Sequence, residues 1–422
     1  MKAKRMVLKN GLRVVAVPMK GNPTATVLVL VEAGSHYEDK KQNGISHFLE
    51  HMCFKGTSNR PSPTAIAHEL DALGASSNAF TSYEFTGYYA KARAQNLGKI
   101  FDVVADLYLH PTVPAEELEK EKGVIIEEIN MYEDLPMRSV GHVLDEVMYG
   151  NQPAGRKILG TKKTIRAMKR DTFLRYRTKH YVPKATTVVV AGNVNAQEVF
   201  KKVKKYFGAL PRAPKVAKPP VKEAQRGVQV GIKHKESSQC HFQLGFRGVP
   251  AGHKDEHAIE VLRAVLGQGM SSRLFKKLRE EMGVCYYIRA TTEYNADHGK
   301  FVIASGVDNG RVELVLNAIM EELTSIKKTL VPPMELAKAK ESLLGNMIMD
   351  LESSDEVAEY FGSQEILHQP LRVSEEYIKK IRAVTGPQVR AAARKFLRSN
   401  TANLALVGPF KTPTRFKKLI RL

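Results

Sequence analysis

The stretch His47-Phe48-Leu49-Glu50-His51 decides how this chain is interpreted, because its residue types and spacing indicate a metal site on a helix. Residues four apart lie one turn apart on the same helical face, so His47 and His51 can share one ion. Glu50 lies beside the same position. Neutral imidazoles suit zinc, and a carboxylate beside a zinc-polarised water can take its proton. For five residues alone, a polar helix face that happens to carry two histidines is the alternative interpretation.

A catalytic zinc ion usually has three protein ligands, and the segment 115–134, predicted to be helical, carries the candidates for the third. These carboxylates are Glu116, Glu117, Glu119, Glu121, Glu127 and Glu128. Helical phase narrows the choice. One stripe is formed by Val124, Ile125, Glu128, Ile129 and Tyr132. A carboxylate on a core-facing stripe is costly unless it is paired or bound to metal, which favours Glu128 over Glu127. Glu121 lies two turns before Glu128 and is the expected supporting partner.

Bulk properties limit the class of protein. The 422 residues suffice for two or three domains, and 43% of them are hydrophobic, as in globular proteins. The net charge of +21 would be compatible with a nucleic-acid partner. However, the lysines are spread along the chain, and the sequence contains no nucleic-acid-binding motif. We therefore expect a solvated basic surface and no nucleic-acid partner.

Cysteine content and apolar runs bear on the compartment. The cysteines Cys53, Cys240 and Cys285 form neither a disulfide framework nor a C-x-x-C pair, which is typical of a reducing compartment. The basic N-terminal segment lacks the apolar run of a signal peptide, and no run reaches the length of a membrane span. We expect a cytoplasmic protein with no membrane partner.

The segments around the motif alternate between strands and helices. Residues 26–32 are predicted to form a buried strand, and Ser46 or Asn43 is expected to cap the motif helix. Residues 74–82 run from a turn into another strand, which could accept an extended peptide by edge pairing. A plain hairpin without a ligand is the alternative.

A weak internal repeat organises the rest of the chain. Residues 181–193 and 397–409 share the order polar turn, apolar strand and glycine, with Gly192 and Gly408 in equivalent places. The segment between the halves is rich in Pro and Lys and is predicted to be a linker. We predict an α+β fold of two homologous domains, each a mixed, mostly antiparallel sheet packed against helices. Their expected bounds are 1–208 for the metal-binding domain, 209–226 for the linker and 227–422 for a second domain without the metal motif.

Several separated runs carry a resemblance to a known family. They are HFLEHMCFKGTSNRP (47–61), SSNAFTS (76–82), EKEKGVIIEEI (119–129) and PAGRKILG (153–160). With these runs in this order, the chain resembles the pitrilysin and mitochondrial-processing-peptidase family of inverzincin metallopeptidases. The resemblance extends over essentially its whole length. Its length resembles that of the short members, whose subunit has two similar domains and pairs with another subunit to form a clamshell.

The resemblance implies roles for individual residues. It implies that His47, His51 and Glu128 bind zinc, that Glu50 is the general base and that Glu121 supports the site. It implies that the strand Asn78-Ala79-Phe80 aligns the substrate backbone. It also implies that the second half supplies Tyr286, which donates a hydrogen bond to the oxyanion, and Arg279, which holds substrate carbonyls.

These implications predict a zinc-dependent endopeptidase that cleaves unfolded or extended peptides inside a dimeric chamber. A homodimer is expected, because the zinc motif and the Arg279–Tyr286 pair occur in one chain. The alternative is a non-catalytic structural or peptide-holding subunit on the same fold. The complete set of His47, Glu50, His51 and Glu128 argues against that alternative.

Overall fold

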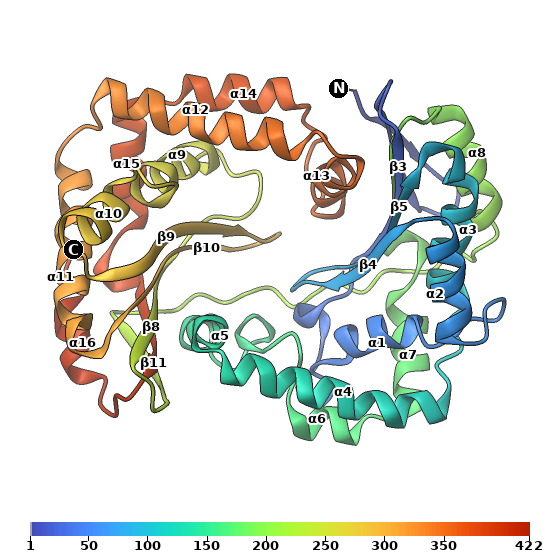
Figure 1. The fold of residues 1–422 in the computed structure, drawn as a ribbon, viewed down its shortest axis with the longest axis horizontal. Helices are drawn as coiled ribbons and strands as arrows, with labels where there is room; N and C mark the ends of the chain where they lie inside the picture. Colours follow the sequence, from blue (N-terminus) through green and yellow to red (C-terminus); the bar gives the residue numbers. More distant parts are fainter. Residues whose placement is uncertain (1) are drawn as a thin grey trace. The chain divides into compact units, whose positions relative to one another are not determined.

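The fold comes from a computed structural model that describes residues 2–422 (Figure 1). The described residues form two compact units, and each unit combines segments from both halves of the sequence. The first unit contains the residues up to Ile129, Lys157–Pro219 and Ile348–Ser374. The second contains Asn130–Arg156, Pro220–Met347 and Glu375–Leu422.

The first unit is built on a six-stranded sheet. Its spatial order is β1 (Lys4–Val7), β2 (Arg13–Pro18), β6 (Thr186–Gly192), β3 (Thr24–Val31), β5 (Thr86–Arg93) and β4 (Ser76–Thr81). Only β2 and β6 pair in parallel, and the other neighbours are antiparallel. The central strands β3 and β6 are nearly continuous β-branched and apolar runs, as expected for strands covered on both faces.

The second unit repeats this topology. Its spatial order is β7 (Gln229–His234), β11 (Ala402–Gly408), β8 (Gln239–Arg247), β10 (Gly299–Asp308) and β9 (Cys285–Tyr294). Here β7 and β11 are the parallel pair, and the other neighbouring strands are antiparallel. The order β7-β11-β8-β10-β9 therefore corresponds to β2-β6-β3-β5-β4. This confirms the α+β fold of two homologous, mostly antiparallel units.

Helices cover the sheets of both units. Those of the first are α1 (Ile45–Cys53), α2 (Pro63–Ala72), α3 (Leu97–Leu109), α4 (Ala115–Asp134), α6 (Lys162–Ala167), α7 (Arg170–His180), α8 (Ala196–Phe207) and α13 (Ser354–Ile366). Those of the second are α5 (Pro136–Tyr149), α9 (Glu256–Gly267), α10 (Arg273–Phe275), α11 (Val312–Lys328), α12 (Pro333–Asp350), α14 (Ser374–Ala383), α15 (Gly386–Phe396) and α16 (Thr414–Leu419). Helices α4 and α12 each end a few residues beyond the unit in which they begin.

Two helices belong to the unit of the opposite sequence half. Helix α5 packs on β7, β8 and β11, whereas α13 packs on β2, β3 and β6 (Figure 1). Glycines allow this close packing: a Cβ on Gly362 of α13 would lie 2.8 Å from Leu30, and one on Gly245 of β8 would lie 2.9 Å from Leu144 of α5. The compact units therefore differ from the linear domains 1–208 and 227–422, because the apolar face of each helix is buried on the other sheet.

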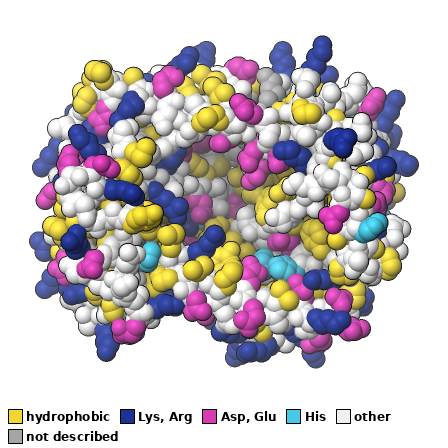
Figure 2. Space-filling view, in the orientation of Figure 1, with side chains coloured by type: hydrophobic (Ala, Val, Ile, Leu, Met, Phe, Trp, Pro, Cys, Tyr) yellow, Lys and Arg dark blue, Asp and Glu magenta, His cyan; other side chains and the backbone are white. Residues whose placement is uncertain are grey.

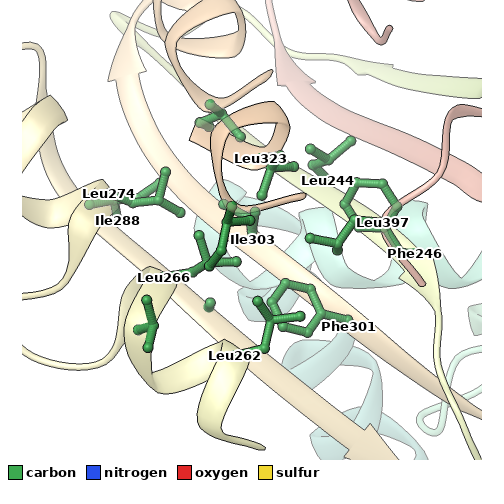
Figure 3. Packing of buried hydrophobic residues seen from close by; sticks show 14 of the residues in the cluster. Leu244, Phe246, Leu262, Leu266, Leu274, Ile288, Phe301, Ile303, Leu323 and Leu397 are labelled. Atoms are coloured by element: carbon green, nitrogen blue, oxygen red, sulfur yellow. The ribbon is translucent and has the colours of Figure 1, made fainter. Parts of the chain in front are cut away.

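The second unit has an extensive apolar core between its sheet and its helices. In Figure 3, Leu244, Phe246 and Ile303 from the sheet face side chains of the covering helices, such as Leu262 and Leu323. In the first unit, one apolar cluster lies between the sheet and α13, where Phe361 is 1% exposed. Burial of these apolar side chains stabilises each sheet against its helices.

The segment that connects the two sequence halves is irregular, and the surface is rich in charged side chains (Figure 2). Residues 211–226, within the predicted linker, contain no helix or strand. Lysine and arginine side chains occur throughout the face shown in Figure 2 and are interspersed with acidic ones. Cys53, Cys240 and Cys285 are all free thiols. Among residues 2–422, no helix has the combination of length and apolar character that crossing a bilayer requires.

Candidate metal centre

Helix α1 holds the histidine motif on an almost completely buried element. His47 and Glu50 are each 9% exposed, and the rings of His47 and His51 lie with their centroids 4.6 Å apart. The one-turn spacing therefore brings the two imidazoles together, as predicted.

The start of α1 differs from the expectation that Ser46 or Asn43 caps it. The helix begins at Ile45 after Gly44, whose φ of +99° is in the region that favours glycine. The buried carboxylate of Glu38 accepts hydrogen bonds from the backbone N–H groups of Gly44 at 2.7 Å and Ser46 at 2.8 Å. Asn43 donates to the same carboxylate at 2.8 Å. The carboxylate of Glu38, from the loop before the helix, thus satisfies the N–H groups that Ser46 or Asn43 was expected to satisfy.

Helix α4 contributes the third candidate ligand. Glu128 Oε2 lies 3.6 Å from His47 Nε2 and 3.7 Å from His51 Nε2. Donor atoms around a tetrahedral zinc ion, each about 2.0–2.2 Å from it, lie roughly 3.3–3.6 Å from one another. The donor set and its spacing therefore fit a divalent ion such as zinc.

The helical phase that favoured Glu128 over Glu127 is confirmed in part. Ile125 and Ile129 are buried, and Glu127 is exposed. Val124 was wrongly placed on the core-facing stripe, since it is 52% exposed. The five positions span an arc of about 140° around α4, and Val124 lies at the edge of that arc, away from the buried isoleucines.

Glu121 supports His51 from behind. Its Oε1 lies 2.8 Å from His51 Nδ1, and its Oε2 lies 2.6 Å from the Lys55 ammonium. Burial alone would raise the pKa of the Glu121 carboxyl, but the hydrogen bonds to His51 and Lys55 lower it below its ordinary value. An ionised Glu121 accepts the Nδ1 proton of His51 and leaves Nε2 free for a metal.

Burial and neighbouring charges also shift the pKa values of His47, Glu50 and Glu128. Burial, with a smaller contribution from His51, lowers the pKa of His47 to about 3, which keeps this imidazole neutral and able to bind metal. Burial raises the pKa of Glu50, and the hydrogen bond from Thr81 opposes that rise. Burial likewise raises the pKa of Glu128. A bound cation would therefore offset the cost of burying the negative charges of Glu50 and Glu128.

Strand β4 and helix α2 form a pocket next to these groups. The pocket has a volume of about 440 Å³ and opens beside Glu50 and His51. Its apolar lining is Phe54, Pro63, Ile66, Ala67, Leu70 and Ala79, and its polar lining includes Lys55, Asp71, Ser77, Asn78 and Glu121. Strand β4 is the edge of its sheet, and the pairing described for it is with β5 alone.

The predicted substrate strand divides between two environments. Asn78 and Ala79 line the pocket. Phe80 instead packs with the core between the sheet and α13, and its ring contacts Phe85 at a centroid distance of 6.2 Å. Of the three predicted substrate-binding residues, Phe80 is therefore the one whose side chain packs away from the pocket.

Arg279 and Tyr286 lie in the second unit. Arg279 follows α10, within a π-helical turn, and its guanidinium lies 5.0 Å from the centroid of the Tyr286 ring. It also donates to the backbone carbonyl of Tyr286. Tyr286 is 75% exposed at the start of β9. The structure thus brings these two residues together, and their roles toward a substrate stay predictions.

Two contacts of the site were not predicted from sequence. They are the hydrogen bond from Thr81 to Glu50 and the ion pair from Lys55 to Glu121. Lys55 comes four residues after His51 but lies beyond the end of α1 at Cys53, so helical spacing does not place it. Thr81 follows the Asn78-Ala79-Phe80 run directly, but no spacing rule connects it with Glu50.

Comparisons with known proteins identify the family of the chain. Residues 13–162 match the family model "Insulinase (Peptidase family M16)", and residues 167–343 match "Peptidase M16 inactive domain". The chain is 36% identical over 409 residues to YmxG of Bacillus subtilis, an uncharacterized zinc protease, with 96% of this chain and 98% of that protein covered. It is 34% identical to an uncharacterized zinc protease of Streptomyces coelicolor, with 97% and 90% covered.

A solved structure extends the comparison to the fold. The crystal structure of a protease from Helicobacter pylori matches with a TM-score of 0.91 and 27% sequence identity, covering 97% of this chain and 99% of that one. The described fold and the sequence similarity therefore lead to the same group of proteins.

Proposed function

The chain belongs to peptidase family M16, and we propose that it is a zinc-dependent endopeptidase acting on unfolded or extended peptides. The observation that carries this proposal is the convergence of His47 Nε2, His51 Nε2 and a Glu128 oxygen within 4.8 Å of one another, beside the Glu50 carboxylate. Relatives of similar length that are named zinc proteases support the choice of metal.

The chain's own residues account for the proton transfers of peptide hydrolysis. Zinc held by His47, His51 and Glu128 supplies Lewis-acid activation of water and of the scissile carbonyl. Glu50 accepts a proton from the attacking water and delivers it to the leaving amine. Glu50 is buried and accepts a hydrogen bond from Thr81, which orients its carboxylate for both transfers.

The edge strand and the pocket support binding of an extended chain. The outer edge of β4 offers backbone groups with which a peptide can pair. The pocket beside Glu50 is lined by apolar side chains, including Phe54, Ile66 and Leu70. We propose that it takes an apolar side chain next to the cleaved bond, while backbone pairing restricts substrates to unfolded segments.

The second unit and the assembly complete the proposal. By family resemblance, Tyr286 donates to the oxyanion and Arg279 binds substrate carbonyls. The contact between the two side chains is consistent with their acting as a pair. We also propose a homodimer in the cytoplasm, to be tested by light scattering on the purified protein and by cell fractionation.

The test is hydrolysis of a quenched fluorescent peptide library with zinc content assayed alongside. Wild type should cleave, a chelator should stop it, and added zinc should restore it. The Glu50→Gln variant should keep one zinc per chain and lose at least about 100-fold in rate. The exposed Glu119→Gln is the matched control and should behave as wild type.

Two results would overturn the proposal. A wild type that holds zinc but cleaves no peptide would favour the peptide-holding subunit. A wild type that binds no zinc would show that the proposed metal centre does not exist.

A further inference from the structure

We infer that Lys55 is a positioning residue for the metal centre, because it fixes Glu121 in the orientation that directs His51 toward the ion. This inference rests on the proposed zinc site and adds a residue to it. The Lys55 ammonium forms its ion pair with Glu121, which is not one of the three candidate ligands. Lys55 therefore acts on the site through Glu121.

The contacts form one chain of polar groups. The Lys55 ammonium lies 2.6 Å from Glu121 Oε2, and Glu121 Oε1 lies 2.8 Å from His51 Nδ1. The two oxygens of one carboxylate are thus each occupied by a different partner. Rotation of the carboxylate would break both contacts, so each partner restrains the orientation seen by the other.

Burial makes the restraint effective. The Glu121 side chain is 5% exposed, whereas Lys55 and His51 are each 24% exposed. A carboxylate buried to this extent is costly unless both of its oxygens are satisfied. Without the ammonium, Oε2 would lose its charged partner at the wall of the pocket, which Glu121 and Lys55 both line.

The direction of the effect separates positioning from simple electrostatics. A cation close to a metal site repels the metal, so removing the Lys55 charge should strengthen zinc binding if charge alone matters. If Lys55 acts by holding Glu121, removing it should weaken zinc binding, since contacts behind a metal ligand typically contribute 10–100-fold in affinity.

The experiment measures the zinc affinity of the metal-free full chain by competition with a chromogenic chelator, without substrate. Lys55→Met should weaken affinity about tenfold, and Lys55→Arg should restore it to within about threefold of wild type. Lys120→Met is the matched control, since Lys120 lies beside Glu121 in sequence but pairs with the exposed Glu116. The control should bind zinc as wild type does.

A double-mutant cycle tests whether Lys55 acts through Glu121. Glu121→Gln should weaken affinity, and adding Lys55→Met should weaken it no further. If Lys55→Met unfolds the protein, as judged by circular dichroism, Lys55→Gln serves in the same cycle.

Three outcomes would overturn the inference. They are an unchanged affinity in Lys55→Met, a tighter affinity, or an effect that adds fully to that of Glu121→Gln. In each of these cases wild type still binds one zinc and the proposed function stands. A wild type without zinc would overturn both.

Discussion

The Thr81 hydroxyl donates a 2.5 Å hydrogen bond to Glu50 Oε2, which joins the end of β4 to the candidate base on α1. Helix α1 and strand β4 also pack against each other directly. The strand proposed to align the substrate therefore also orients the carboxylate proposed to activate water. This connection couples substrate placement to base placement, because both depend on one short edge strand.

The first prediction concerns this hydrogen bond. Thr81→Val removes the donor but keeps the branched shape, so Glu50 should lose its orientation. We expect kcat to fall about tenfold with KM within about twofold of wild type. Thr81→Ser should keep most of the rate, and zinc content should be unchanged in both variants. A Thr81→Val enzyme with wild-type kcat would show that the contact has no role in the reaction.

The second prediction compares two adjacent glutamates of α4. Glu128→Gln should weaken zinc binding at least about 100-fold, because the neutral amide is a poor ligand in place of the carboxylate. Glu127→Gln should leave the affinity unchanged, since Glu127 is exposed. Zinc competition with a chelator measures both. Equal losses in the two variants would indicate that helix charge, rather than one ligand, holds the ion.

The third prediction concerns the pocket beside Glu50. Ala67→Leu adds an apolar side chain to the pocket lining from α2. We expect kcat/KM to fall roughly tenfold for peptides with a large side chain at the preferred position, with little change for alanine there. A peptide series varied at that position measures the difference. Equal changes for both peptides would mean that the pocket does not select the side chain.

The fourth prediction concerns stability at acid pH. Asp106 is 3% exposed and accepts hydrogen bonds from Thr57 and Arg60. Burial would raise its pKa, but these bonds lower it below the ordinary value of 3.8. Its contribution to the free energy of unfolding is therefore present above about pH 4 and is lost as pH falls through the lowered folded pKa.

Urea unfolding between pH 7 and pH 3 tests this contribution. Asp106→Asn should lower the free energy of unfolding at pH 7 by about 2–4 kcal/mol and should flatten its decline in acid. Asp171→Asn, at an exposed position on α7, should change neither quantity. An Asp106→Asn variant with the wild-type acid slope would assign the decline to other groups.

The sequence was sufficient to predict those parts of the site that depend on residue spacing within one helix or strand. The four-residue step from His47 to His51 fixes their common face, and the phase of α4 separates Glu128 from Glu127. The repeat was also readable, because β6 and β11 have the same apolar strand ended by glycine. These features are local, and local rules describe them.

The sequence was insufficient to predict contacts between helices and strands that are far apart along the chain. Neither the amphipathic pattern of α5 nor that of α13 states which sheet will bury its apolar face, so the exchange of these helices was missed. The Thr81–Glu50 bond was missed for the same reason, and the Glu38 cap was missed because the loop between Glu38 and α1 follows no regular spacing. Each joins residues whose proximity is decided by packing and not by periodicity.

The most direct test of the central claim is anomalous X-ray diffraction at the zinc absorption edge from crystals of the zinc-loaded protein. We predict one anomalous peak per chain, about 2.0–2.2 Å from His47 Nε2, His51 Nε2 and a Glu128 oxygen. A peak coordinated by other residues, or no peak at this position in zinc-loaded crystals, would contradict the account.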